Sequence, residues 1–447
     1  MKNFNLDING SALNEVATDV LKPVGVNRNF IVWMSFLGMA LIPCIYAYYI
    51  QLQEGLIVTG LRDLVSWGMY IANFVFFVAT SLVGMLISSV LGLIGFKWVK
   101  PITRIAEIIA VAFAAIAGIV IISDMGRPDR LHHILMHGRV QSPIVWDITV
   151  VNTYFFLSLL LYFLPLIPDL AIAKGRLKNP PLWLVKAYEI LSFKWTHHPE
   201  QYKLLFKGVR VLLVLIIPTA FAIHTVTSWL FAVTPRAGWD STIFGPYFIT
   251  GAFVAGSAAV VIAMFIFRKI YKLENYLSDH VFDMMGKLLV LVALIYLYFN
   301  LNEFLVPAYK MKEADATHIM HLVAGEYAPM FWFVQIAGLI LPIILLTLPK
   351  MRKPLPIAII SAFVLIASWF KRYLIVIPTM AHPFLPVQQG LPDDYIHYQP
   401  TLIENFVTLG SFILALMVMS VLAKLFPVIP IWEIAEEKQN EVKTTEQ

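Results

Sequence analysis

Residues 247–267 read YFITGAFVAGSAAVVIAMFIF and contain no charged side chain. A helix needs roughly 20 apolar residues to cross the ~30 Å hydrocarbon core of a bilayer. Comparable segments recur along the chain, so we expect about ten membrane-spanning helices. Their expected ranges are 30–51, 68–95, 102–123, 143–167, 204–232, 243–268, 281–306, 328–348, 355–378 and 402–426.

The composition agrees with this expectation. Hydrophobic residues make up 59% of the 447 residues, charged residues 14%, and the mean hydropathy is +0.76. A soluble domain needs a more strongly charged exterior, so the sequence predicts an all-α integral membrane protein. The net charge of +5 does not indicate nucleic-acid binding, because the basic residues lie in loops on one side of the membrane.

The distribution of positive charge predicts the orientation. Most of the 33 lysines and arginines fall in the segments on the N-terminal side of the expected helices, for example Lys97, Lys100, Arg268 and Lys269. Cytoplasmic loops are enriched in such residues, so both termini should be cytoplasmic. We expect a cytoplasmic segment 1–29 without a removable signal peptide, a membrane domain 30–426 and a cytoplasmic tail 427–447.

A weak internal repeat suggests how the helices are grouped. Segment 72–93 resembles 247–267, and the helix that follows each segment ends in an acid and a proline. Membrane folds often contain such repeats. We therefore expect two four-helix bundles with additional helices beside them.

Four ionisable residues are expected near the periplasmic ends of the helices, and these are our candidate catalytic residues. Burying an ionisable group in a bilayer costs at least ~2.5 kcal/mol, so each such group needs a structural or functional reason. Carboxylates and an imidazole in an apolar cavity suit the oxidation of a quinol, in which two protons leave with two electrons. The four residues are Asp124, Asp147, His224 and Glu303.

Other charges should lie near the cytoplasmic side of the membrane. Glu107 and Lys287 could form a structural ion pair, which we slightly favour, or could belong to an inner proton path together with Asp283. Both interpretations are kept open.

The sequence favours neither a metal site nor a resident redox cofactor. His132, His133 and His137 are candidate ligands, but only His133 and His137 have helical spacing and zinc needs at least a third ligand. Surface imidazoles explain His132 and His137 better. Cys44 is the one cysteine, too few for an iron–sulfur cluster. His224 alone lies well inside a span, so two histidines cannot bind a haem together.

Several motifs, taken in order, resemble the NrfD/PsrC family of quinone-reactive membrane anchors in polysulfide-reductase-like complexes. They are DMGRPDR (124–130), SPIVWD (142–147), IHTVTSWLFA (223–232), NEFLVPAY (302–309) and WFKRYLIVIPT (369–379). The best resemblance is to the ten-helix subgroup, which includes ActC of alternative complex III and the NrfD-like anchors of sulfur-metabolism complexes. Asp124 and Asp240 depart from the ActC pattern, which has histidine at both places, and Lys371 stands where some relatives have Glu.

The resemblance implies a subunit of a respiratory oxidoreductase that is not active alone. Such subunits sit in the cytoplasmic membrane of bacteria or archaea, bind menaquinol or ubiquinol near the periplasmic face, and carry no redox cofactor. The implied partners are a periplasmic ferredoxin-like iron–sulfur subunit, a second NrfD-like or other membrane subunit, and cytochrome c-type subunits. The resemblance leaves open a coupling to proton translocation.

The motifs also imply roles for single residues. Asp147 resembles the family's quinone-site acid, with His224 as its partner, while Asp124 or Glu303 would pass protons outward. Trp67 and Trp146 could line the cavity or belong to an interfacial belt. Arg127 could contact the quinone, although shaping the loop and docking the partner suit an arginine better.

Two other classes of function are also compatible with the sequence. An ion or solute transporter with a polar site at the membrane midplane would have a similar number of helices. A purely structural anchor with a vestigial pocket is the third, and the buried acids argue against it.

Overall fold

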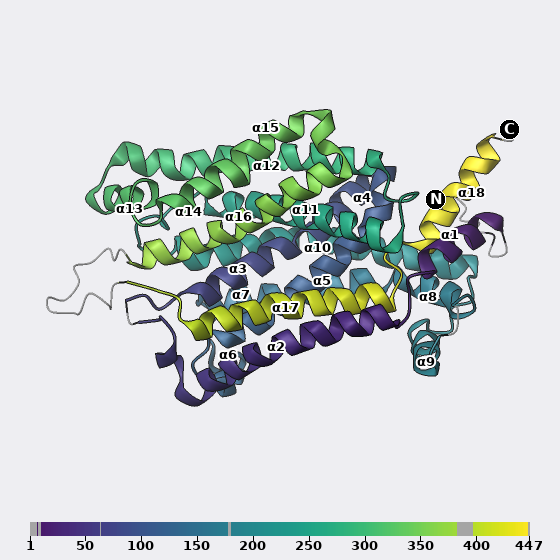
Figure 1. Ribbon diagram of the computed structural model, residues 1–447, viewed down its shortest axis with the longest axis horizontal. Helices are drawn as coiled ribbons and strands as arrows, with labels where there is room; N and C mark the ends of the chain where they lie inside the picture. Colours follow the sequence, from purple (N-terminus) through teal and green to yellow (C-terminus); the bar gives the residue numbers. More distant parts are fainter. Residues whose placement is uncertain (1–6, 8–9, 63, 178–179, 382–396, 446–447) are drawn as a thin grey trace.

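The computed structural model describes residues 7, 10–62, 64–177, 180–381 and 397–445. Every regular element in these residues is helical, as Figure 1 shows. Among the described residues, ten helical segments are long and apolar enough to span a membrane, which confirms the expected number.

Six of the spans are single helices, and four contain more than one helical element. The single helices are α2 (Arg28–Glu54), α10 (Pro199–Ala232), α11 (Phe244–Tyr271), α12 (Asp279–Lys310), α16 (Pro354–Ala381) and α17 (Leu402–Leu425). The composite spans are α3 (Met69–Ser81) with η2 (Met85–Leu91) and α4 (Gly92–Ile94); η3 (Lys97–Val99) with α5 (Lys100–Ser123); α7 (Pro143–Phe163) with α8 (Leu166–Lys174); and α14 (Ala328–Trp332) with η5 (Phe333–Ile340) and α15 (Leu341–Thr347).

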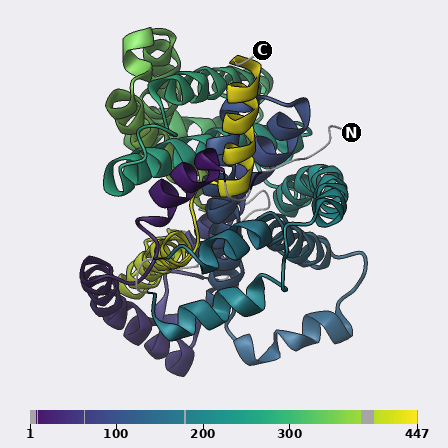
Figure 2. The same cartoon turned by 90° about the vertical axis from the view of Figure 1, so that its right-hand side faces the viewer.

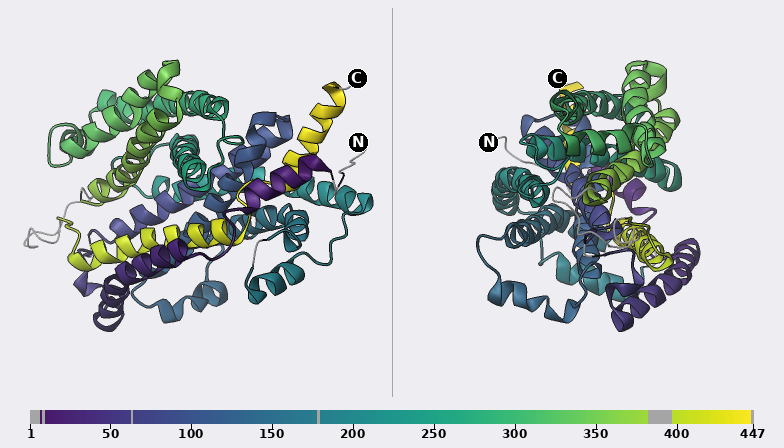
Figure 3. Two further views of the ribbon diagram at one scale, coloured as in Figure 1. Left: turned by 45° about the vertical axis from the view of Figure 1, so that its right-hand side comes forward. Right: turned by 90° about the vertical axis from the view of Figure 1, so that its left-hand side faces the viewer.

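The spans form two four-helix bundles with the same order of neighbours. In the first bundle α3 packs on α5, α5 on α7, α7 on α10, and α10 on η2. In the second bundle α11 packs on α12, α12 on α15, η5 on α16, and α16 on α11. Figure 3 shows α2 and α17 as a separate pair beside the first bundle. The expected architecture is thus confirmed.

The interface between the bundles is close because small residues line it. A Cβ added to Gly256 on α11 would lie 2.5 Å from the Cβ of Val83 in the α3 span, so only glycine fits there. In the apolar window of the α3–α4 span 94% of residues are buried, against 22% in α2. Small residues are typical where membrane helices approach closely, so α3 and α11 form the centre of the molecule.

Shorter helices cover both ends of the bundles. The end that carries both terminal helices, here called the termini end, has α1 (Ser11–Leu21), α9 (Leu182–Leu191), η6 (Pro349–Arg352) and α18 (Ile431–Thr445) (Figure 2). The opposite end, here called the loop end, has η1 (Leu56–Val58), η4 (Pro128–Arg130), α6 (His132–His137) and α13 (Glu313–Val323). These segments were expected only as connections, because helices of this length give no membrane-span signal.

At the termini end, a buried carboxylate holds α18 against the first bundle. Asp169 on α8 is fully buried, and its Oδ1 accepts hydrogen bonds of 3.0 Å from the backbone N–H groups of both Ile431 and Trp432. Its Oδ2 accepts one of 3.1 Å from the guanidinium of Arg104 on α5. An acid at the N-terminus of a helix satisfies donors that have no partner within the helix, so Asp169 acts as the cap of α18.

Candidate functional site

Asp147 lies one turn into α7 and is buried in the first bundle. The helix begins at Pro143, whose fixed backbone angle suits the first helical position, and Asp147 is 4% exposed. Its Oδ1 accepts a hydrogen bond of 2.5 Å from the hydroxyl of Thr227 on α10. A carboxylate has about four acceptor positions, so this one bond leaves acceptor capacity for a further ligand.

His224 lies three residues before Thr227, and residues at this spacing share one face of a helix. The ring is 2% exposed, and its Nδ1 lies 3.3 Å from the carbonyl oxygen of Ala220. We assign the proton to Nδ1 from this contact, which makes Nε2 an acceptor. Nε2 is buried and has no hydrogen-bond partner among the described residues. Asp147 and His224 therefore present acceptors from neighbouring helices of one bundle.

Aromatic rings lie one turn closer to the loop end. Phe231 follows Thr227 by four residues on α10, and its ring centroid lies 5.6 Å from that of Trp67 and 5.1 Å from that of Trp239. The indole N–H of Trp239 donates a 2.6 Å hydrogen bond to the carbonyl of Ile375 on α16, which fixes the group. Trp67 thus packs against interior aromatic residues.

Trp146 has a different environment. It is half-buried, its indole N–H donates to the carbonyl oxygen of Val140, and its ring centroid lies 6.3 Å from that of Trp229. Trp229 is 42% exposed. Trp146 therefore lies at the outer edge of the α7–α10 pair.

Arg127 is found at the surface of the loop end. Its side chain is 64% exposed and forms a two-point ion pair with Asp129, with distances of 3.0 and 2.9 Å. The Arg127 guanidinium holds the pKa of the Asp129 carboxyl below its usual range. An exposed guanidinium of this kind suits contact with another protein better than contact with a ligand buried beside Asp147.

Asp124 directly follows the last residue of α5, on the side of α17. The carbonyl of its neighbour Ser123 accepts a 2.7 Å hydrogen bond from Gln51, and Gln51 accepts one of 2.6 Å from Tyr70. Asp124 interacts electrostatically with Tyr70 and with Glu404 on α17. These neighbours place Asp124 in a polar group between α2, α3, α5 and α17.

Glu303 lies in the second bundle. Its carboxylate forms a buried ion pair of 3.3 Å with Lys371 on α16, and the two side chains are 9% and 4% exposed. The ammonium of Lys371 also lies 4.5 Å from the ring centroid of Phe304 and 5.3 Å from that of Tyr247. The sequence alone assigned Lys371 no role, and the structure shows it as the partner of Glu303.

Arg372 was not identified from the sequence. Its side chain is buried, its guanidinium lies 5.2 Å from the ring centroid of Phe248, and its charge acts on both His224 and Tyr296. It therefore lies between the two bundles. A pair of cations inside the apolar range 354–381 is the sequence signal that could have indicated it.

The pairing of Glu107 with Lys287 is wrong. Glu107 lies 3.7 Å from Arg104, three residues earlier on α5, whereas Lys287 binds Asp283 on its own helix at 2.6 Å. Asp283 also binds Arg352 at 2.5 Å. The residues expected near the cytoplasmic side therefore form two separate clusters. One contains Glu107 and Arg104, and the other contains Asp283, Lys287 and Arg352.

The histidine rings of α6 meet edge to face, with interplanar angles of 89°. Ring centroids lie 4.4 Å apart for His132 and His133 and 5.4 Å apart for His133 and His137. Within the part of the chain that the structure describes, no group of three His, Cys, Asp or Glu side chains could hold a metal ion.

Comparison with known proteins gives a consistent family match. The family model described as "Polysulphide reductase, NrfD" matches residues 57–383. A subunit of the selenate reductase of Mesobacillus selenatarsenatis is 26% identical, over 92% of this chain and 96% of its own length. The integral membrane subunit of an Hdr-like menaquinol oxidoreductase of Archaeoglobus fulgidus is 22% identical, over 88% of this chain and 92% of its own length. The integral membrane subunit of a menaquinone reductase of Nitratidesulfovibrio vulgaris is 24% identical, over 96% of this chain and 98% of its own length.

Proposed function

Because the chain belongs to the NrfD family of polysulphide reductase membrane proteins, we propose that it is the quinone-binding subunit of a multisubunit oxidoreductase. Its substrate would be menaquinol or ubiquinol, as the names of two relatives suggest for menaquinone. The observation that carries the proposal is the buried pair of acceptors, Asp147 and Nε2 of His224, on facing helices.

The pair suits the chemistry of a quinol. A quinol that becomes a quinone loses two hydroxyl protons and two electrons. Asp147 and His224 would each accept one hydroxyl proton, and the electrons would pass to the iron–sulfur partner. Thr227 would hold the Asp147 carboxylate in place while the second oxygen meets the substrate. In the reverse direction the same groups would return the protons.

We place the iron–sulfur subunit at the loop end. The exposed Arg127 and Arg130 suit an acidic partner surface, and the acceptor pair lies near this end of α7 and α10. Electron transfer needs the partner's cluster close to the quinone, so a partner at the termini end would be separated from the pair by most of the membrane. The second membrane subunit and the cytochrome c-type subunits belong to this proposal as family expectations.

Cysteine labelling tests the orientation. We propose that the loop end is periplasmic. In a Cys44→Ser background, the variant His132→Cys should therefore react with a membrane-impermeant maleimide added to spheroplasts. Lys186 is an exposed residue of α9, and the variant Lys186→Cys should react only after the membrane is opened. The reverse pattern would place the loop end in the cytoplasm and remove the proposed periplasmic partner.

We further propose that electron transfer in this subunit is coupled to proton translocation. Asp147, Tyr154, Ser158 and Tyr162 lie on one face of α7, and the hydroxyls of Ser158 and Tyr162 are buried without a partner in the described residues. This face leads from the acceptor pair toward Glu107. Proteoliposome proton uptake that is identical in wild type and Glu107→Gln would argue against this path.

A transporter with a midplane site has weaker support. Such folds use broken helices at equivalent places in their repeats. Here the π-helical segments η2 and η5 lie in the first span of one bundle and the third span of the other, which are not equivalent positions.

A further inference from the structure

Arg372 is a buried cation with unused donors. Its side chain is 2% exposed, and it lies on α16, one of the candidate membrane-spanning helices. The Nε and Nη1 groups have no hydrogen-bond partner among the residues that the structure describes. A guanidinium cannot lose its proton at physiological pH, so this positive charge is permanent.

The surrounding helices do not supply a second negative charge. Glu303 on α12 is paired at 3.3 Å with Lys371, the neighbour of Arg372 in the sequence. The sequences of α11, α16 and the span from α14 to α15 contain no acid at all. The other acids of α12, Asp279 and Asp283, lie at its opposite end, about 30 Å away by the helical rise. The cluster therefore has two cations and one anion.

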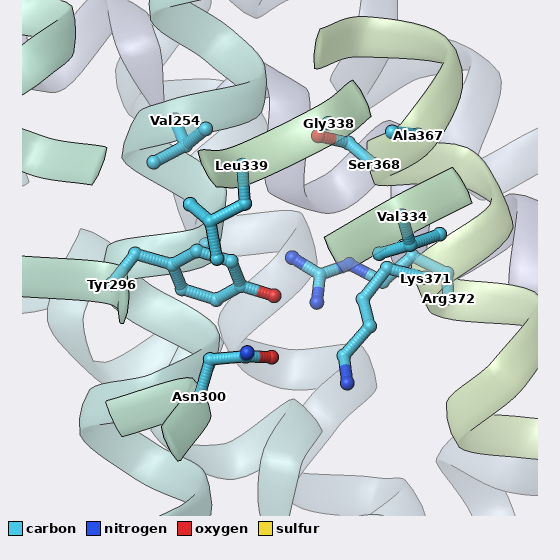
Figure 4. Close-up of a pocket in the computed structure, with 11 residues that line it drawn as sticks. Val254, Tyr296, Asn300, Val334, Gly338, Leu339, Ala367, Ser368, Lys371 and Arg372 are labelled. Atoms are coloured by element: carbon cyan, nitrogen blue, oxygen red, sulfur yellow. The ribbon is translucent and has the colours of Figure 1, made fainter. Parts of the chain in front are cut away.

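A small cavity adjoins these groups. Its volume is about 20 Å³, and Gly251 on α11 and Gly338 on η5 contribute to its wall. Figure 4 shows the hydroxyl of Tyr296 pointing toward the guanidinium of Arg372 there, while the amine of Lys371 is directed away from both groups. A volume of this size suits a ligand as small as one or two water molecules.

Hydrogen-bond donors are in excess around the cavity. Besides Arg372, the buried Nε2 of Gln335 has no partner within the described ranges, although its Oε1 accepts a 2.7 Å hydrogen bond from Asn300. Asn300 itself lines the cavity. A ligand must therefore accept hydrogen bonds. Water can do so but leaves the positive charge uncompensated, and an unpaired buried charge is strongly unfavourable.

We propose that Arg372 holds a small monovalent anion of halide size in this cavity, between α11, α12 and α16. The anion would accept hydrogen bonds from the guanidinium. It would also balance the second positive charge of the cluster, since Glu303 compensates only one of the two cations. The residues that line the cavity belong to the second bundle, whereas Asp147 and His224 belong to the first, and the proposal does not depend on quinone binding.

The test compares halide with a bulky anion. The intact complex should unfold at a higher temperature in sodium chloride or bromide than in sodium gluconate of equal ionic strength, with saturation as the halide concentration rises. Arg372→Gln should lose this response. Arg352→Gln should keep it, because Arg352 has its own counter-ion, Asp283.

A second measurement removes the dependence on the variants. Crystals of the wild-type complex grown in bromide should show an anomalous scattering peak beside the Arg372 guanidinium. Ordered water there without anomalous signal, or a halide response that is equal in wild type and Arg372→Gln, would overturn the proposal.

Discussion

The substitution Asp147→Asn is expected to lower quinol-linked turnover of the intact complex by about 10²- to 10⁴-fold, the usual contribution of a general acid–base group. Asn has the shape of Asp and can still accept the hydrogen bond from Thr227, so the helix pair should remain in place. It cannot accept a proton from the quinol. The turnover with a quinol analogue is the quantity to measure, with the amount of assembled complex determined in the same membranes.

Asp129→Asn is the matched control. This carboxylate lies in the loop that precedes α7, but it is exposed and paired with Arg127. Its removal should leave the chemistry of a bound quinol unchanged. Wild-type turnover in Asp147→Asn would exclude Asp147 as a proton acceptor, whereas equal losses in both variants would point to a role of the loop in assembly.

Asp169→Asn should destabilise the termini end by about 3–5 kcal/mol, the cost of removing one partner from a buried ion pair. The substitution leaves Arg104 buried with Glu107 at 3.7 Å as its remaining counter-ion. It also weakens the cap of α18, because a neutral amide is a poorer acceptor for the N–H groups of Ile431 and Trp432. The unfolding temperature should fall, and trypsin should cleave after Lys438 more rapidly.

Asp279→Asn provides the comparison for this effect. Asp279 also binds an arginine, Arg268 at 2.7 Å, but its carboxylate is 64% exposed. Ion pairs of this kind contribute about 0–1 kcal/mol, so the variant should unfold close to the wild-type temperature. Similar losses in both variants would show that burial does not set the contribution of Asp169.

The number and order of the spans could be predicted because both depend on composition. A segment such as 247–267 has no soluble alternative, and its length matches the bilayer. The grouping into two bundles followed from the repeat. The short helices α1, α9 and α18 were missed, since their stability comes from packing against the bundle ends rather than from a long apolar sequence.

The structure groups only some of the candidate site residues. Asp147 and His224 lie in one bundle, but Glu303 lies in the other with Lys371, and Asp124 faces the α17 side. Depth along a helix can be read from a sequence, whereas the direction in which a residue faces around the bundle depends on tertiary packing. The error over Glu107 has a different origin. Arg104 lies three residues before Glu107, at helical contact distance, so this local pair can be read from the sequence without knowledge of the tertiary packing.

The proposed function depends above all on a quinone that binds between Asp147 and His224 in the first bundle. A structure of the intact complex with a bound menaquinone analogue would show this binding site directly. Density for the quinone head group should lie within hydrogen-bond distance of the Asp147 carboxylate and of Nε2 of His224. Head-group density in the second bundle beside Lys371, or at the termini end, would show that the proposed site is wrong.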